Sequence, residues 1–256
     1  MSDLSIIKEI AEQALAIPTV KGTVDRYLID RAQRVLRHCG GISQLPEVRG
    51  FQVDHECLNI AALFRDTGFA RYANAEDKAS RMVLADLTDS DIRDFSSQVV
   101  HEKLGELLNP RQLELTCSIM IHSGNRSTRL VEAMILADAR NLDDMGAAGI
   151  FSDLRRYVVH GRGLSEALAS WRRKIDYDYW TARLRESFRF KTVAELAERR
   201  LAKAMEFMQQ LECENRASDL EQMLLEDGGL VVEPMKRAIM AVPEPVQRAA
   251  AVQVTG

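Results

Sequence analysis

The spacing of the apolar residues constrains this chain more than any other feature of its sequence. Apolar residues recur every three or four positions through most of the 256 residues, and no alternating run bounded by turn residues interrupts them. The pattern is clear over residues 5–16, 24–36, 57–64, 92–108, 112–121, 130–145, 164–184 and 192–211. This spacing predicts an all-α fold.

The helical pattern weakens after residue 215, and this sets the expected domain organisation. The run Asp227-Gly228-Gly229 and three later prolines break up what remains. No repeat and no internal linker is visible before that point. We therefore expect one helical domain over residues 1–215. Residues 216–256 should form a tail that docks on this domain, binds a protein partner or is partly disordered.

Composition argues against several classes of protein. A formal net charge of −4 does not favour a nucleic-acid partner. No segment approaches the roughly 18 continuous apolar residues that a membrane span needs. The four cysteines lie far apart and form no CxxC pair, which is typical of a reducing compartment. The N-terminal stretch carries acidic residues and no basic region, unlike a secretory signal. We therefore expect a cytoplasmic protein that binds neither a membrane nor nucleic acid.

Charged residues stand at positions that the helical pattern assigns to the core. Arg31 completes the apolar stripe of the helix over residues 24–36, and Asp138 falls in the middle of the stripe over residues 130–145. Arg65 and Asp66 directly follow the apolar run AALF at 61–64. A buried charge without a partner would cost several kcal/mol, so these residues must meet one another, a metal or a ligand. The sequence predicts a buried polar cluster.

Three motifs around these residues resemble those of the HD superfamily of metal-dependent phosphohydrolases. That family carries a His three residues before an Arg-Val, then AALLHDIG, then a stretch such as DADRLDAIGAIGI. This chain has Arg31 three residues before Arg34-Val35, AALFRDTG at 61–68, and ADARNLDDMGAAGIF at 137–151. The stretch at 187–212 is similar to the closing helix of single-domain bacterial members. The resemblance implies an all-α HD domain over roughly residues 20–215.

The departures from these motifs bear on function. The metal-binding His of the first motif falls on Arg31, and the His of the His-Asp pair falls on Arg65, whereas Asp66 and Asp138 match the two aspartates. A guanidinium stays protonated and has no lone pair to give a metal. The resemblance therefore implies a degenerate form of the two-His, two-Asp metal site, with Asp66 and Asp138 as the candidates for any catalytic role.

One interpretation is a pseudoenzyme that acts as a binding or regulatory protein. The two arginines would stand where the metal stood and neutralise the buried carboxylates. A second interpretation keeps an enzyme, either a metal-dependent phosphohydrolase or an oxygenase-like enzyme. Two-metal members of the family add two histidines, and His101 and His122 match them, so Asp66, His101 and His122 would hold one Fe, Mn or Zn ion. Arg31 and Arg65 would then grip a substrate phosphate.

A third interpretation is an anion or nucleotide receptor without chemistry, with the same arginines as phosphate clamps and Arg126 at the mouth of the pocket. The sequence thus implies either no cofactor or one divalent transition metal bound by Asp66, His101, His122 or Asp138. The expected partners are a phosphate-containing small molecule, or a protein bound through the C-terminal tail. The sequence is also compatible with a homo-oligomer.

Overall fold

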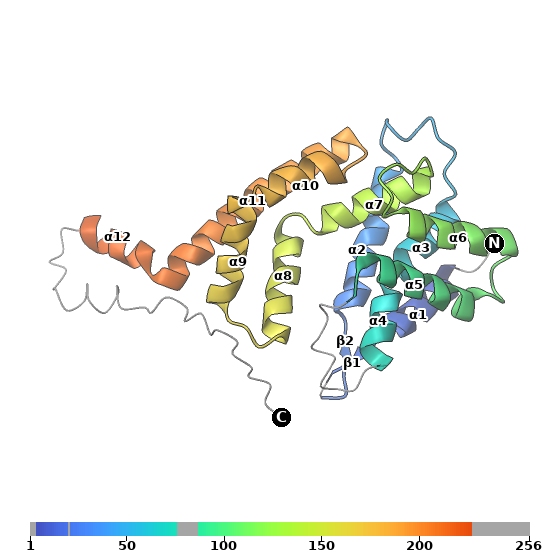
Figure 1. Cartoon of the computed structure of the whole chain (residues 1–256), viewed down its shortest axis with the longest axis horizontal. Helices are drawn as coiled ribbons and strands as arrows, with labels where there is room; N and C mark the ends of the chain where they lie inside the picture. Colours follow the sequence, from blue (N-terminus) through green and yellow to red (C-terminus); the bar gives the residue numbers. More distant parts are fainter. Residues whose placement is uncertain (1–3, 20, 76–86, 227–256) are drawn as a thin grey trace, which may run out of the picture. The chain divides into compact units, whose positions relative to one another are not determined.

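The computed structural model describes residues 4–19, 21–75 and 87–226, and these residues are helical almost throughout, which confirms the all-α prediction (Figure 1). The chain divides into two compact units, residues 1–205 and 206–256. The division falls within helix α11, Lys191–Arg216. The second unit contains the end of α11 and helix α12, Ser218–Glu226. Residues 227–256 of the predicted tail lie outside the described residues.

In its described residues, the first unit contains ten helices that precede α11, the first part of α11, and one short hairpin. The helices are α1 (Leu4–Leu15), α2 (Tyr27–Ile42), α3 (His55–Phe64), α4 (Thr67–Ala75), α5 (Asp89–Leu104), α6 (Pro110–His122), α7 (Val131–Asp143), α8 (Ala147–Val159), α9 (Leu164–Asp176) and α10 (Tyr179–Ser187). Strands β1 (Ile17–Pro18) and β2 (Val24–Asp25) pair antiparallel between α1 and α2.

Helix α3 is the centre of this unit. Every residue from Cys57 to Phe64 except Asn59 is buried, so α3 is apolar nearly all round and must be covered on several sides. Helices α1, α2, α5, α6 and α7 all contact it. The junction that follows α3 is therefore buried too, and this is where Arg65 and Asp66 stand.

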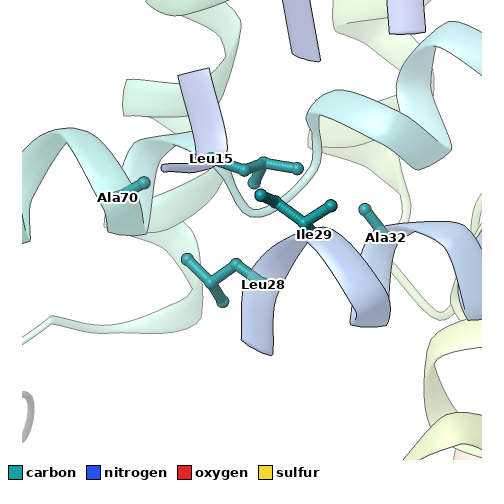
Figure 2. Close-up of a cluster of buried hydrophobic side chains, with 5 residues drawn as sticks. All are labelled: Leu15, Leu28, Ile29, Ala32 and Ala70. Atoms are coloured by element: carbon teal, nitrogen blue, oxygen red, sulfur yellow. The ribbon is translucent and has the colours of Figure 1, made fainter. Parts of the chain in front are cut away.

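A second packing centre joins α1, α2 and α4. Leu15 of α1, Leu28 and Ile29 of α2 and Ala70 of α4 point toward one another with Ala32 beside them (Figure 2). These side chains are at most 4% exposed. This contact fixes the N-terminal half of α2 against α4, and Arg31 lies on that part of α2.

Two helix starts follow the local signals of the sequence. The Thr88 hydroxyl accepts a hydrogen bond from the Asp91 amide, and the Asp91 carboxylate accepts one from the Thr88 amide, so the two form a capping box at the start of α5. Helix α6 begins with Pro110 behind an Asn109 cap. The first cap fixes the position of Asp89 at the head of α5.

The structure differs from the periodic pattern in several places. Helices α4 and α8 occur where no helix was expected, and Val24 lies in β2 instead of in a helix. The expected helix over residues 164–184 is two helices, because Asp178 adopts a left-handed conformation with φ of 50° and ends the run between α9 and α10. Helices α8 and α9 lie side by side (Figure 1). In the described part of the chain, no helix has the length and apolar character to cross a membrane.

Candidate functional site

Arg31 joins α2 to the end of α7 and to the junction after α3. Its Nη2 donates a hydrogen bond to Asp144 Oδ1 at 2.9 Å, and its Nε lies 3.5 Å from Asp143 Oδ2. Its Nη1 lies 3.6 Å from Asp66 Oδ2. Burial alone would lower the pKa of Arg31, but Asp66 and Asp144 hold it above its ordinary value. The prediction that Arg31 faces a buried cluster and meets Asp66 is confirmed.

Arg65 is the largest side chain among the fully buried residues, and only 1% of it is exposed. It is the C-cap of α3, so the burial of α3 carries its side chain into the protein. Its Nη2 donates to Asp89 Oδ1 at 2.6 Å, and its Nη1 lies 3.8 Å from Asp66 Oδ1. The Ser96 hydroxyl donates a hydrogen bond to the backbone carbonyl of Arg65. Burial, and then the neighbouring guanidinium of Arg140, lower the pKa of Arg65 to about 9.

Arg140 is the third cation around Asp66. Its Nη2 donates to Asp66 Oδ1 at 3.2 Å, and its Nη1 donates to Asp89 Oδ1 at 3.3 Å. Asp66 thus lies between guanidiniums from α2, from the end of α3 and from α7. Burial alone would raise the pKa of Asp66, but Arg31, Arg140 and Arg65 hold it below its ordinary value. Asp66 is an ionised carboxylate enclosed by three arginines.

These pairs belong to one connected set, which we call the arginine network. Within the described residues it consists of six arginines and four aspartates: Arg31, Arg34, Arg65, Arg93, Arg140 and Arg183 with Asp66, Asp89, Asp143 and Asp144. Positive charge is therefore in excess. Several buried donors of the network, namely Arg65 Nη1 and the Nε atoms of Arg31, Arg65 and Arg140, have no hydrogen-bond partner in the described part of the chain. The network has capacity for a further anion.

Asp138 does not join this network, which corrects the expected convergence of Arg31, Asp66 and Asp138. It is fully buried, as predicted. Its carboxylate, however, accepts hydrogen bonds from the backbone amides of Arg189 and Phe190, at 3.0 Å each. Burial raises the pKa of Asp138 to about 6, although these amide donors oppose the shift.

Helix geometry explains why Arg140 occupies the place expected for Asp138. Two residues along a helix correspond to a turn of about 200°, so only one of the two positions can face α2 and α3. The motif DADRLD has aspartates two residues apart, and when its first falls on Asp138 its second falls on Arg140. Arg140 is therefore a third arginine around Asp66, and it stands where the motif carries an aspartate, whereas Arg31 and Arg65 stand where the motifs carry histidines.

Replacement of Asp138 by alanine should lower the free energy of unfolding by about 2–4 kcal/mol, because two buried backbone amides lose their acceptor. Asp138→Asn should cost less, since its side-chain oxygen still accepts. Urea denaturation of both variants measures the difference. Asp94→Ala, at an exposed position of α5, is the control. A loss for Asp138→Ala as small as that of the control would contradict the capping role.

The two candidate histidine ligands lie at the surface. His101 is exposed near the end of α5, and His122 is exposed at the last position of α6. The described residues contain no cluster of three His, Cys, Asp or Glu side chains that could hold a metal ion. The structure thus does not bring His101 and His122 together with Asp66. The expected set fails because His101 and His122 are exposed at the ends of their helices, whereas Asp66 is buried at the junction of α3 and α4.

Two cavities meet at one wall of the network. The larger, of about 470 Å³, is lined by Arg31, Asp66, Arg140, Asp144 and Arg183 together with aromatic and basic residues of α2 and α8–α10. The smaller, of about 320 Å³, is lined by Asp89 and by the exposed side chain of Arg126, the candidate at the pocket mouth. Arg140, Asp144 and Arg183 line both cavities.

Comparisons with known proteins give the fold. No protein-family model matches the chain, and no curated protein sequence matches it. Two solved structures of YpgQ from Bacillus subtilis are similar to it. One is the complex of YpgQ with ADP, at 22% identity and a TM-score of 0.53, and it covers 84% of this chain and 97% of YpgQ. The other is the selenomethionine form, at 20% identity and a TM-score of 0.50, with 84% and 96% covered.

Proposed function

We propose that this protein is a degenerate member of the HD superfamily that binds a phosphate-containing small molecule without hydrolysing it. The observation that carries the proposal is the enclosure of Asp66 by the guanidiniums of Arg31, Arg65 and Arg140, at 3.6, 3.8 and 3.2 Å. In this position the arginines supply the positive charge that a divalent ion supplies in a phosphohydrolase.

The residues around Asp66 do not fit a metal ion. A guanidinium offers five donors and no lone pair, so none of the three arginines is a ligand. A divalent cation beside Asp66 would also lie against three positive charges. Hydrolases of this kind use the metal to generate a nucleophile from bound water near neutral pH. Without a fitting metal site, we infer binding or regulation as the function.

The larger cavity suits a ligand that is both anionic and planar. Arg155, Arg156 and Lys174 line it together with Tyr27, Tyr179 and Trp180. The Arg155 guanidinium lies 4.4 Å from the centre of the Tyr27 ring, and the Lys174 ammonium lies 5.2 Å from the Trp180 ring. The cations can bind the phosphate of such a ligand. The aromatic faces beside them can contact its planar ring. The ADP in the Bacillus subtilis YpgQ structure makes ADP a reasonable probe.

Calorimetry tests the proposal with ADP and inorganic pyrophosphate in the presence of a chelator. The native chain should bind at least one of them. Arg156→Ala and Lys174→Ala should each weaken binding about five-fold, since each removes one partly screened charge. Their common partner Asp153 remains in both variants. Arg173→Ala, an exposed residue of α9 outside the cavity lining, is the matched control and should bind as the native chain does.

Two results would contradict the proposal. One is the absence of binding of both probes by the native chain. The other is rapid release of phosphate from ADP or pyrophosphate when Mn, Mg or Ni is added. If Arg156→Ala and the Arg173→Ala control weaken the binding of the probe equally, the ligand lies outside the larger cavity.

A further inference from the structure

Asp89 is an exposed carboxylate held by three arginines. It is the first residue of α5, and 54% of its side chain is exposed. Its Oδ1 accepts from Arg65 at 2.6 Å and from Arg140 at 3.3 Å, and its Oδ2 accepts from Arg93. These guanidiniums, Arg140 and Arg65 above all, hold the pKa of Asp89 well below its ordinary value although partial burial alone would raise it. The carboxylate occupies a strongly positive position.

The cations around Asp89 exceed what one carboxylate can satisfy. Arg65 is 1% exposed, and its Nη1 and Nε have no hydrogen-bond partner among the described residues. Arg140 divides its donors between Asp89 and Asp66, and its Nε also lacks a partner in that part of the chain. A buried guanidinium with unused donors is costly, so an anion with more charge and more acceptor oxygens would stabilise this arrangement.

The smaller cavity gives such an anion a place beside Asp89. Its volume of about 320 Å³ lies within the size range of small-molecule sites. Arg126, Arg183 and Arg189 line it as further cations. Its acidic lining residues are Asp89, Asp144 and Glu186, and Arg183 and Arg185 already pair with the latter two, respectively. Asp89 is therefore the lining carboxylate that several guanidiniums share, and a movement of its side chain would leave them without this acceptor.

Gly124 contributes a specific fit at this position. A Cβ on Gly124 would come within 2.2 Å of Arg93 Nη1, the atom that donates to Asp89. A side chain at position 124 would therefore displace the end of the Arg93 side chain from its present place beside Asp89. The loop before α7 and the head of α5 together shape the anion position.

We propose that the smaller cavity is a second anion site, for inorganic phosphate or a phosphate monoester, and that Asp89 is an internal competitor that occupies it. A phosphate dianion brings two charges and several acceptor oxygens where Asp89 brings one charge and two oxygens. On binding, phosphate takes the place of the Asp89 carboxylate against Arg140, which lines the cavity together with Arg126 and Arg183, and the exposed Asp89 side chain turns to solvent. This site adjoins the ligand site in the larger cavity, with which it shares Arg140, Asp144 and Arg183, and differs from it in Asp89 and Arg126.

Removal of the competing charge tests the proposal. Asp89→Asn keeps the size of the side chain and should raise the affinity for inorganic phosphate about ten-fold or more, measured by calorimetry at low ionic strength with chloride as the reference anion. Asp94→Asn removes a carboxylate from an exposed position of the same helix and should leave the affinity unchanged. No gain with Asp89→Asn, or an equal gain with Asp94→Asn, would overturn the proposal.

A second pair of variants places the phosphate. In the Asp89→Asn background, Arg126→Ala should remove most of the gain, whereas Arg129→Ala, an exposed neighbour outside the cavity lining, should not. If Arg156→Ala abolishes phosphate binding and Arg126→Ala does not, the phosphate lies in the larger cavity. The second site is then wrong while the proposed function stands. Should Asp89→Asn fail to fold, the native chain decides, since Arg126→Ala must weaken phosphate binding and Arg129→Ala must not.

Discussion

Replacement of Asp66 by alanine should destabilise the protein by about 3–5 kcal/mol, because it leaves one buried and two partly buried guanidiniums without the carboxylate they share. Arg31, Arg65 and Arg140 all lie within 3.8 Å of this carboxylate. Arg65 suffers most, since only 1% of its side chain is exposed, against 15% for Arg31 and 17% for Arg140. Urea denaturation followed by circular dichroism measures the loss, and Asp66→Asn should give a similar one because it too removes the charge.

An exposed ion pair is the control for this loss. Glu102 lies 2.7 Å from Arg71, and more than half of its side chain is exposed. Glu102→Ala should cost no more than about 1 kcal/mol. Arg140→Met should recover part of the loss in the Asp66→Ala background, because it removes one of the stranded cations. Equal losses for Asp66→Ala and Glu102→Ala would show that the three arginines do not depend on Asp66.

The sequence predicts the helices whose apolar stripes are long, and it misses the shorter or partly exposed ones. Helix α8 has a single buried residue, Ile150, so its apolar residues form no continuous stripe. Helix α4 follows directly on the Arg65-Asp66 pair, and Gly68 near its start is a weak helix former. At Gly68 a Cβ would come within 2.4 Å of the Ile92 carbonyl oxygen, so close packing against α5 requires this glycine.

Within the site, the sequence predicts Arg31, Arg65 and Asp66 but misses their partners. Arg140 in the last turn of α7 and Asp144 at its C-cap are four residues apart, a spacing that usually marks a solvated helix face. Asp89 precedes the first apolar residue of its helix and looks like part of a start signal. These residues become partners of the site because the buried α3–α4 junction brings Arg65 and Asp66 up to them, and only tertiary structure shows that.

Restoring a metal site should require three substitutions and not two. Arg31→His and Arg65→His would place two imidazoles near Asp66, but Arg140 would remain 3.2 Å from the same carboxylate. The positive charge of Arg140 opposes a divalent ion, so this double variant should not bind one. The triple variant with Arg140→Asp replaces that cation by a fourth ligand. It should bind one Mn or Zn ion per chain, because two histidines and two carboxylates then converge.

Calorimetry with Mn and Zn distinguishes the two variants, and circular dichroism checks that both are folded. Arg34 and Arg183 still pair with Asp143 and Asp144 in the triple variant, so these carboxylates keep a partner. If the double variant binds a metal as tightly as the triple variant, Arg140 does not occupy a ligand position. Asp138 would then be the better candidate for the fourth ligand.

The metal content of the native chain tests the central claim most directly. Protein purified without an affinity tag or chelator is analysed by inductively coupled plasma mass spectrometry for Fe, Mn, Zn, Co, Ni and Cu. Because three guanidiniums surround Asp66, we predict no transition metal in stoichiometric amount, in the same preparation that binds ADP or pyrophosphate. One equivalent of a transition metal that is lost on Asp66→Asn, or on His101→Ala and His122→Ala, would contradict the account.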